Sequence, residues 1–229
     1  GYLVPPERRR IIEAAREVDR AAQGVWRLMR GAGAPVSGEV RVTSTDSLCL
    51  RVLPQIAAEL RALAPDLSLV FLCTNAHLDL GRVHADITVR PARQLPDDLA
   101  GIGVGHMRFA AFAPAGLAEA DCDGLPWLGL HGALARSDAA RWMEAEGIEP
   151  EGGADSFVVL AEMVALRQGR ALLPEFLAAQ DARLQPLPGT EVGMTVPLWV
   201  AAHPDLAEVP RVAKVRGLLC EALARRFAA

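Results

Sequence analysis

The chain has 229 residues, of which 51% are hydrophobic and 23% charged, so it is long enough for two compact lobes or for one large domain. No apolar run approaches the roughly 18 residues that a membrane-spanning helix needs. A formal net charge of −4 argues against non-specific binding of nucleic acid by these residues. The first residues show no signal-peptide pattern, and Gly1 in place of Met indicates a fragment of a longer chain.

The cysteines and histidines form no known metal or redox motif. The four cysteines, Cys49, Cys73, Cys122 and Cys220, are widely spaced and form no CxxC pair. We expect them to act as small apolar core residues, with a redox-sensing thiol as the alternative. The five histidines form no HxxxH or HExxH pattern, so we expect no metal site and no cofactor.

The first segment has the most regular pattern in the chain. Pro5 and Pro6 suit a helix start, and Gly31 and Gly33 suit its end. Between them, apolar residues recur at alternating spacings of four and three, which is a heptad seam. The seam consists of Ile11, Ala15, Val18, Ala22, Val25 and Met29. It predicts a dimerising helix, and the alternative is a helix that packs on its own domain.

The next part of the chain alternates between strand and helix patterns. Short apolar runs predict strands at 40–43, 67–73 and 85–89. A helical face from Cys49 to Leu63, ended by Pro65, lies between the first two. Nearly unbroken apolar strands in a β-α-β order indicate a parallel sheet that is covered on both faces.

The second half of the chain continues this α/β pattern. Further strands are predicted at 109–113, 127–130, 170–173 and 197–202. Asp155 is expected to cap an apolar helix that runs to about Gln168. A last amphipathic helix is marked by Val212, Val215, Leu219 and Ala222.

Five small polar residues, Thr43 to Ser47, connect the first strand to its helix, although one capping residue would suffice. Thr45 and Ser47 would lie at the helix N-terminus, where unpaired N–H groups and the helix dipole favour a carboxylate or phosphate. This is also the carboxyl end of a parallel strand, where open α/β sheets bind ligands. The alternative is simple capping by Thr45 or Asp46, and Asp46 opposes an anion unless its carboxylate points away.

Polar side chains also follow other predicted strands or precede helices. Arg90 and Arg93 follow the strand at 85–89, and arginine can bind a carboxylate through two parallel hydrogen bonds. Thr74 and Asn75 follow the strand at 67–73, and Asp155 and Ser156 precede the apolar helix. Together these turns favour a ligand site, whereas each residue alone suits a solvated surface.

Sequence motifs of common enzymes are absent. The chain has no GxSxG, GxGxxG or GxxxxGK[ST] pattern. His131 in GLHG could act as a general base, but no nucleophile is paired with it in the sequence. We therefore expect a binding protein and no enzyme.

Several motifs occur together in a characteristic order. After the long helix come GEVRVTSTDSLCLRVLPQIAAELRALAPDLSLVF at 38–71, ADITVRP at 85–91, ALLP at 171–174 and PLWVAAHPDL at 197–206. In this order they resemble the linker helix and effector-binding domain of LysR-type transcriptional regulators. The resemblance covers nearly the whole chain, and the winged helix-turn-helix that reads DNA in that family would lie upstream.

The resemblance implies an α/β fold, with two Rossmann-like lobes of the type 2 periplasmic-binding-protein fold behind a long linker helix. The dimerisation helix would take residues 1–37, lobe I residues 38–107 and 197–229, and lobe II residues 108–196. It also implies a cytoplasmic protein that forms dimers or tetramers with itself, has no membrane partner, and contacts promoter DNA only through the missing domain.

The resemblance further implies a small effector, which we expect to be anionic, in the cleft between the lobes. Residue-by-residue matching places Thr45, with Ser47 after it, where the family has a ligand-contacting hydroxyl. The other expected site residues are cleft positions of the family and their neighbours: Thr74, Asn75, Arg90, Leu130, His131 and Ser156. Arg170 departs from the family pattern, which often has an apolar residue there.

The alternative function is a periplasmic-type solute-binding protein, which the heptad helix and the missing signal peptide oppose.

Overall fold

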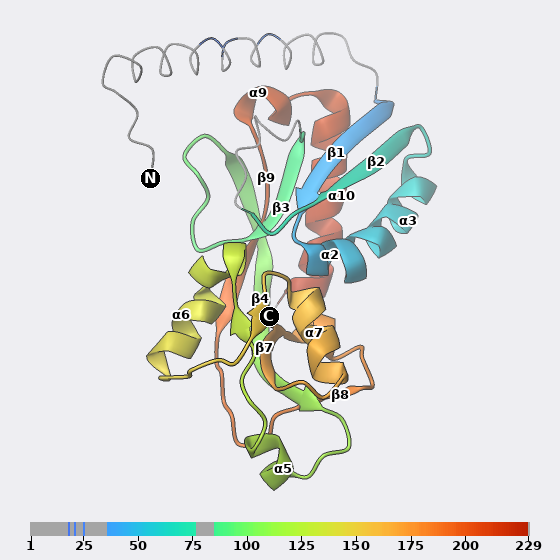
Figure 1. Ribbon diagram of the computed structural model, residues 1–229. Helices are drawn as coiled ribbons and strands as arrows, with labels where there is room; N and C mark the ends of the chain where they lie inside the picture. The colour runs from blue at the N-terminus through green and yellow to red at the C-terminus, as the bar shows by residue number, and fades with distance from the viewer. Residues whose placement is uncertain (1–17, 19–20, 22–24, 26–35, 77–84, 229) are drawn as a thin grey trace, which may run out of the picture.

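The computed structural model describes residues 36–76 and 85–228, together with residues 18, 21 and 25 (Figure 1). The first half of the chain forms β1 (Gly38–Ser44), α2 (Asp46–Arg51), α3 (Leu53–Leu63), β2 (Leu67–Cys73), β3 (Ile87–Pro91), β4 (Ala100–Pro114) and α5 (Glu119–Asp123). The second half forms β5 (Gly129–Leu130), η1 (Gly132–Arg136), α6 (Asp138–Ala145), β6 (Gly153–Ala154), α7 (Phe157–Ala165), β7 (Ala171–Pro174), α8 (Glu175–Ala178), β8 (Leu184–Pro186), β9 (Thr195–Ala202), α9 (Pro204–Ala207) and α10 (Pro210–Phe227).

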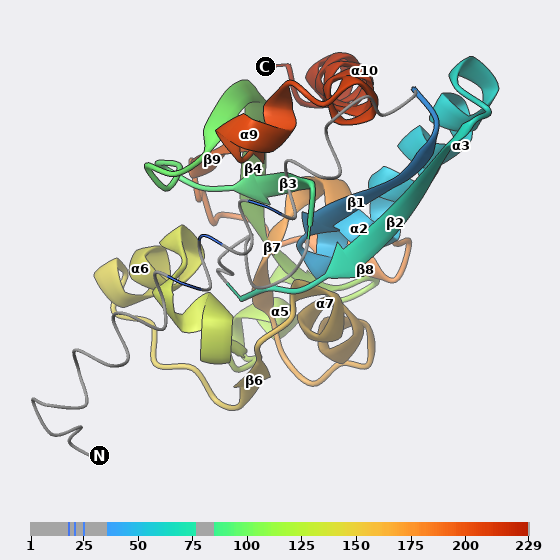
Figure 2. The same cartoon turned by 90° about the horizontal axis from the view of Figure 1, so that it is seen from above.

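A sheet in the order β2-β1-β3-β9-β4 forms the part of the molecule that we call lobe I (Figures 1 and 2). β1 pairs in parallel with both β2 and β3, as the strand-helix alternation predicts. β9 lies between β3 and β4 and is antiparallel to both. α3 packs against β2, and α10 packs against β1, β4 and β9.

β4 is a strand of 15 residues that leaves lobe I and enters a second group of elements, lobe II. Its residues from Ala100 to Arg108 pair with β9, whereas Phe109 to Phe112 pair with β7. β9 runs beside β4 in the opposite direction, so two strands link the lobes (Figure 1). The predicted strand at 109–113 is therefore only the end of a longer strand, because glycines interrupt the apolar pattern of its first half.

Local chemistry explains the other differences from the predicted elements. The helix predicted from Cys49 to Leu63 is split at Val52, because Pro54 lacks an N–H group and begins a new helix. Ser156, and not Asp155, caps α7 by accepting a hydrogen bond from the Val159 N–H at 3.1 Å. This helix ends at Ala165, before the predicted end.

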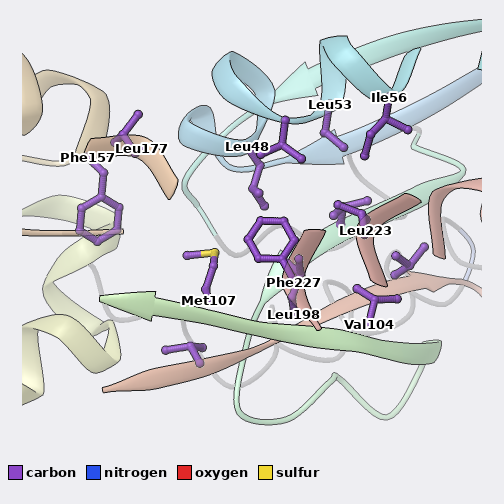
Figure 3. Packing of buried hydrophobic residues seen from close by; sticks show 14 of the residues in the cluster. Leu48, Leu53, Ile56, Val104, Met107, Phe157, Leu177, Leu198, Leu223 and Phe227 are labelled. Carbon is purple, nitrogen blue, oxygen red and sulfur yellow. The ribbon is translucent and has the colours of Figure 1, made fainter. Parts of the chain in front are cut away.

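Side chains from both ends of the chain fill the interior of lobe I (Figure 3). Leu48 and Leu53 from α2 and α3 point toward Leu223 and Phe227 of α10, and Leu198 of β9 lies beneath them. All five side chains are buried. Burial of one such side chain contributes about 1.5–3 kcal/mol, so α10 is needed to complete lobe I.

Most of the predicted dimerisation helix lies outside the described residues. Val18 and Val25 of its seam are described, and they are 69% and 57% exposed. Within the described residues, no helix combines the length and the apolar character that crossing a membrane would require.

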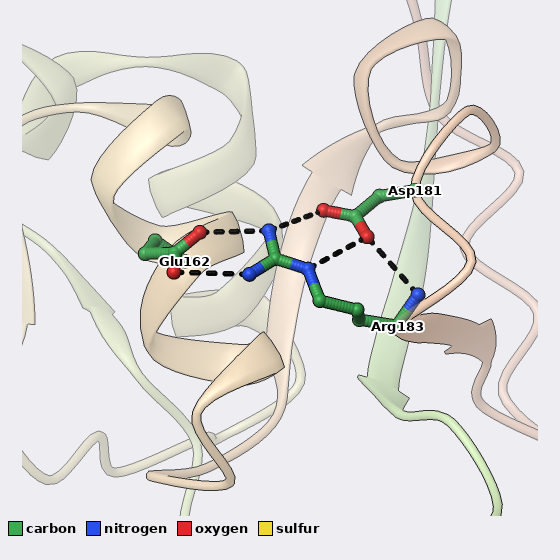
Figure 4. Close-up of polar contacts among 3 residues, drawn as sticks. All are labelled: Glu162, Asp181 and Arg183. Atoms are coloured by element: carbon green, nitrogen blue, oxygen red, sulfur yellow. Dashed lines mark hydrogen bonds and ion pairs between the residues drawn. The ribbon is translucent and has the colours of Figure 1, made fainter.

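An ion-pair cluster stabilises lobe II between α7 and β8 (Figure 4). The Arg183 guanidinium contacts Glu162 at 2.8 Å and Asp181 at 2.7 Å. Hydrogen bonds from Arg183 lower the pKa of both carboxyls below their ordinary values of 4.5 and 3.8. The cluster therefore ties α7 to the turn that precedes β8.

We expect the substitution Gly105→Ala to destabilise the protein strongly. Gly105 has a φ of 137°, and a Cβ there would overlap the main chain of Phe227 at the end of α10. The backbone conformation alone costs about 1–3 kcal/mol for a residue with a side chain. Gly103→Ala is the control, because its Cβ would meet the Trp199 ring at 3.6 Å, which is an ordinary contact. Equal urea midpoints for the two variants would contradict this account.

We expect the ion-pair cluster to make stability depend on pH in the acid range. Carboxyls with a lowered folded pKa contribute stability above their ordinary pKa and lose it as the pH falls through the folded values. Arg183→Gln should therefore reduce the free energy of unfolding at neutral pH, and the difference from the parent should shrink toward about pH 3. Arg108→Gln, which removes a guanidinium that contacts Glu175, is the control. A difference that stays constant with pH would exclude this role for Arg183.

Candidate functional site

A cavity of about 290 Å³ lies between the two lobes. Lobe I supplies the start of α2, Asn75 and the segment from Arg90 to Gln94. Lobe II supplies the turn from η1 into α6, together with Phe157. The linking strands supply Met107, Phe109 and Val196. Its volume is near the lower end of the range for small-molecule sites, so it suits a compact ligand.

The start of α2 forms one wall of the cavity, and its first backbone donors already have partners. The N–H of Asp46 donates to Asn75 Oδ1 at 3.2 Å, and the N–H of Ser47 donates to Asp46 Oδ1 at 2.6 Å. The Thr45 side chain makes no capping bond, and its Oγ1 lies 3.4 Å from Ser47 Oγ. Of the two capping candidates, Thr45 therefore makes no capping bond, whereas the Asp46 carboxylate accepts a hydrogen bond from the first turn of the helix.

The same aspartate joins the two lobes. Asp46 Oδ2 accepts hydrogen bonds from Asn75 Nδ2, at 2.8 Å, and from the Ser156 hydroxyl at the start of α7. Asn75 Nδ2 also donates to the backbone carbonyl of Asp155 at 3.0 Å. We call Asp46, Asn75, Asp155 and Ser156 the interlobe clasp. These hydrogen bonds hold together three polar turns that are far apart in the sequence, namely those after β1, after β2 and before α7.

Arg90 fastens the chain that follows β2. Its Nη1 donates to the Ala76 carbonyl at 2.6 Å, and its Nη2 donates to the Thr74 carbonyl at 3.0 Å and to Thr43 Oγ1 at 3.4 Å. Partial burial lowers the pKa of the Arg90 guanidinium. These contacts hold the cavity wall in place, and they leave the positive charge of Arg90 without a carboxylate partner among them.

The opposite wall contains a cluster of charged residues around Asp138, the first residue of α6. The Asp138 side chain is only 8% exposed, and Oδ1 lies 2.5 Å from Arg93 Nε and 2.6 Å from Arg141 Nη2. Arg141 Nη1 also donates to the Arg136 carbonyl at 3.1 Å. Because Arg93 belongs to lobe I, this cluster is a second connection between the lobes.

The sequence did not predict most of the charged cluster around Asp138 on the opposite wall. Arg93 was considered, but not Arg136, Asp138 or Arg141, because no predicted strand ends at this turn. Ser137 caps α6 by accepting a hydrogen bond from the Ala140 N–H at 3.2 Å. The Ser-Asp pair is a helix-start signal, which could have marked the turn.

Apolar side chains fill the space between the polar walls. The rings of Phe109 and Phe157 are 5.5 Å apart between centroids and are tilted by 59°. Met107, Leu134 and Val196 line the same region. A ligand that spans the cavity would therefore meet polar groups at its ends and apolar groups along its body.

The structure places four of the eight expected site residues on the cavity wall: Thr45, Ser47, Asn75 and Arg90. Thr74 and Ser156 are not on the wall and instead support it through the Arg90 contact and the interlobe clasp. Leu130 lies in β5, and His131 is exposed with its Nε2 3.3 Å from the Gly152 carbonyl, so neither lines this cavity.

Arg170, the departure from the family pattern, also lies away from the cavity wall. Its Nη1 contacts Asp123 at 3.1 Å. The guanidinium lies 5.0 Å from the centre of the Trp127 ring, a cation–π distance. This arginine therefore contributes to the packing of lobe II.

The cysteines differ in their surroundings. Cys122 is buried as expected, Cys49 and Cys220 are half-buried, and Cys73 is exposed. Burial, and to a lesser degree the neighbouring Cys73, raises the pKa of Cys49 to about 12, so this thiol stays protonated at neutral pH. In the part of the chain that the structure describes, no three His, Cys, Asp or Glu side chains gather as a metal site would require.

We expect Ser156→Ala to lower stability more than Ser137→Ala does. Both serines cap a helix, and loss of a cap costs typically about 1 kcal/mol. Only Ser156 also donates a hydrogen bond across the lobes to Asp46. Urea unfolding of the two serine variants tests this difference. Adding Asp46→Asn and the double variant Ser156→Ala/Asp46→Asn would measure the coupling free energy between Ser156 and Asp46. Equal losses for the two serine variants would show that the interlobe bond contributes no stability.

Solved structures with the same fold come from regulators of transcription. The regulatory domain of CrgA, a LysR-type regulator from Neisseria meningitidis, is 19% identical, has a TM-score of 0.68, and matches 83% of this chain and 99% of its own. The effector domain of the transcriptional regulator AmpR from Pseudomonas aeruginosa is 16% identical, with a TM-score of 0.70 and coverage of 83% and 98%. These matches confirm the expected type 2 periplasmic-binding-protein fold.

Two comparisons of sequence agree with the fold. The Mau operon transcriptional activator of Paracoccus denitrificans is 33% identical over 81 residues, which span 35% of this chain and 29% of that protein. The model of the LysR substrate binding domain matches residues 33–224. These matches favour a regulator over the solute-binding protein that the sequence left open. The chain therefore belongs to the LysR substrate binding domain family.

Proposed function

We propose that this chain is the ligand-sensing part of a LysR-type transcriptional regulator and that it binds a small anionic effector in the cavity between its lobes. The observation that carries the proposal is the charge of the cavity wall. Four arginines, Arg90, Arg93, Arg136 and Arg141, line it with one aspartate, Asp138. A cavity with such an excess of positive charge attracts anions and stabilises them when they are bound.

The relatives support the regulatory part of the proposal. CrgA and AmpR are named as regulators, and the Paracoccus protein is named as a transcriptional activator. A second CrgA structure is not limited to the regulatory domain. It matches 98% of this chain, and the match covers 80% of that structure. Promoter DNA would be contacted by a segment of the regulator beyond the 229 residues of this chain.

Self-association is the other part of the proposed regulatory role. Val18 and Val25, one heptad apart, present apolar side chains to solvent. A second copy of the same helix would cover them, as the heptad seam predicts. Dimerisation would bring two effector domains together and would link ligand binding to the geometry of the assembled regulator.

Effector binding would act through the relative position of the lobes. The cavity wall contains residues of both lobes, and the interlobe clasp and the Arg93–Asp138 pair lie beside it. A molecule that contacts both walls favours the arrangement in which both are within reach. The two linking strands would carry the change in the relative position of the lobes to the rest of the domain.

We expect small carboxylic acids, but not their uncharged amides, to stabilise this chain. A bound acid at about 100 times its dissociation constant adds roughly 2.7 kcal/mol to the free energy of unfolding. Melting temperatures measured with a panel of acids, each beside its amide of the same shape, test the charge requirement directly. Equal effects of acids and amides would exclude an anionic effector. No response to a broad panel of acids would count against the proposed function.

A further inference from the structure

We propose an orientation for the effector, which rests on the proposed function. Its acidic group lies at the arginine cluster, Arg93, Arg136 and Arg141 around Asp138. A neutral hydrogen-bonding group at its other end lies at the hydroxyls of Thr45 and Ser47. The two polar walls of one cavity thus have opposite chemical roles.

The start of α2 is a poor place for an acid. The N–H groups of Asp46 and Ser47 donate to Asn75 and to Asp46 itself. The Asp46 carboxylate therefore already occupies the position that a bound anion would take. A second carboxylate beside it would be repelled by the like charge.

The hydroxyls on this wall remain suited to a neutral group. Thr45 Oγ1 and Ser47 Oγ are 3.4 Å apart, which is a long distance for an O–H···O bond. Each hydroxyl can donate one hydrogen bond and accept others. Ser47 is only 1% exposed and Thr45 is half-buried, so Thr45 is the more accessible of the two. The Thr45 hydroxyl can therefore bind a hydroxyl or an amide group, and the nearby Asp46 carboxylate favours a partner that carries a hydrogen-bond donor.

Arg90 does not turn this wall into an acid site. Both of its terminal nitrogens donate to protein oxygens, at the Ala76 carbonyl, the Thr74 carbonyl and Thr43. These bonds use up to three of the five N–H donors of the guanidinium, and turning the group toward a ligand acid would loosen the chain after β2. Arg90 therefore positions this wall and adds its positive charge to it.

The opposite wall already binds a carboxylate. Asp138 lies between Arg93 and Arg141, at 2.5 and 2.6 Å, and Arg136 adds a third positive charge to the wall. The side chains of Arg93 and Arg141 are 71% and 56% exposed, so they can turn toward a ligand while one of them keeps Asp138. A ligand acid there would receive charge-assisted hydrogen bonds, which contribute about 1.5–3 kcal/mol each.

The middle of the cavity determines the rest of the ligand. Phe109, Phe157, Met107 and Leu134 present apolar surfaces between the two walls. A flat ring packs well against tilted aromatic side chains. The expected class is therefore a compact acid with an apolar, ring-shaped body and a neutral donor group at the end opposite the acid.

Three probes differ only at the end opposite the acid: benzoate has no polar group there, 4-hydroxybenzoate has a hydroxyl, and terephthalate has a second carboxylate. Dissociation constants from titration calorimetry on this chain should place 4-hydroxybenzoate first and terephthalate last. Arg141→Gln should weaken benzoate and 4-hydroxybenzoate about tenfold or more, the loss of one charged hydrogen bond. Thr45→Val should abolish the preference for 4-hydroxybenzoate while leaving benzoate within about twofold.

Arg183→Gln is the matched control, because it removes the same charge from the same lobe at a position away from the cavity wall. It should leave all three dissociation constants unchanged. If terephthalate binds best, or if Thr45→Val weakens benzoate as much as Arg141→Gln does, the orientation is wrong although an anion still binds. If none of the probes binds the parent at millimolar concentration, the ligand class is wrong, and the wider acid panel then decides the proposed function separately.

Discussion

The Asp46 carboxylate is the group on which the arrangement of the two lobes depends. It satisfies a backbone donor of its own helix, accepts from Asn75 in lobe I, and accepts from Ser156 at the start of α7 in lobe II. A carboxylate can accept several hydrogen bonds at once, which neither an amide nor a hydroxyl does as well. One side chain thereby fixes the start of α2, the chain after β2 and the approach of lobe II.

The hydrogen bonds that Asp46 makes across the lobes are important because the main chain connects the two lobes at few places. β4 and β9 are the linking strands, and two strands can twist and bend relative to the sheets at their ends. Side-chain contacts therefore help to set the relative position of the lobes, both beside the cavity and where α2 packs against α7 and α8. The interlobe clasp and the Arg93–Asp138 pair lie at different parts of the cavity wall, so a molecule between them is in a position to affect both.

The α/β pattern and the parallel pairing around β1 could be predicted from the sequence, because buried parallel strands produce unbroken apolar runs such as the one at 67–73. The division into two lobes was implied only by the resemblance to LysR-type regulators. Thr45, Ser47, Asn75 and Arg90 could also be chosen, since each follows a strand at the ligand-binding edge of the sheet. Arg136, Asp138 and Arg141 could not, because their meeting with Arg93 depends on how lobe II sits against lobe I. The role of Asp46 was ambiguous in the sequence, since an aspartate at a helix start can cap the helix, face solvent or bridge to another element.

The glycine in the middle of β4 limits where the linking strands can move. At Gly105 the backbone adopts a conformation that favours glycine, and the last turn of α10 occupies the space that a side chain would need. The strand is thus clamped to the end of α10 just before it changes partner between Arg108 and Phe109. Any rotation of lobe II relative to lobe I would therefore bend β4 after Gly105, near Met107, which lines the cavity. The stretch of β4 that follows the contact with α10 is therefore also part of the wall of the cavity between the lobes.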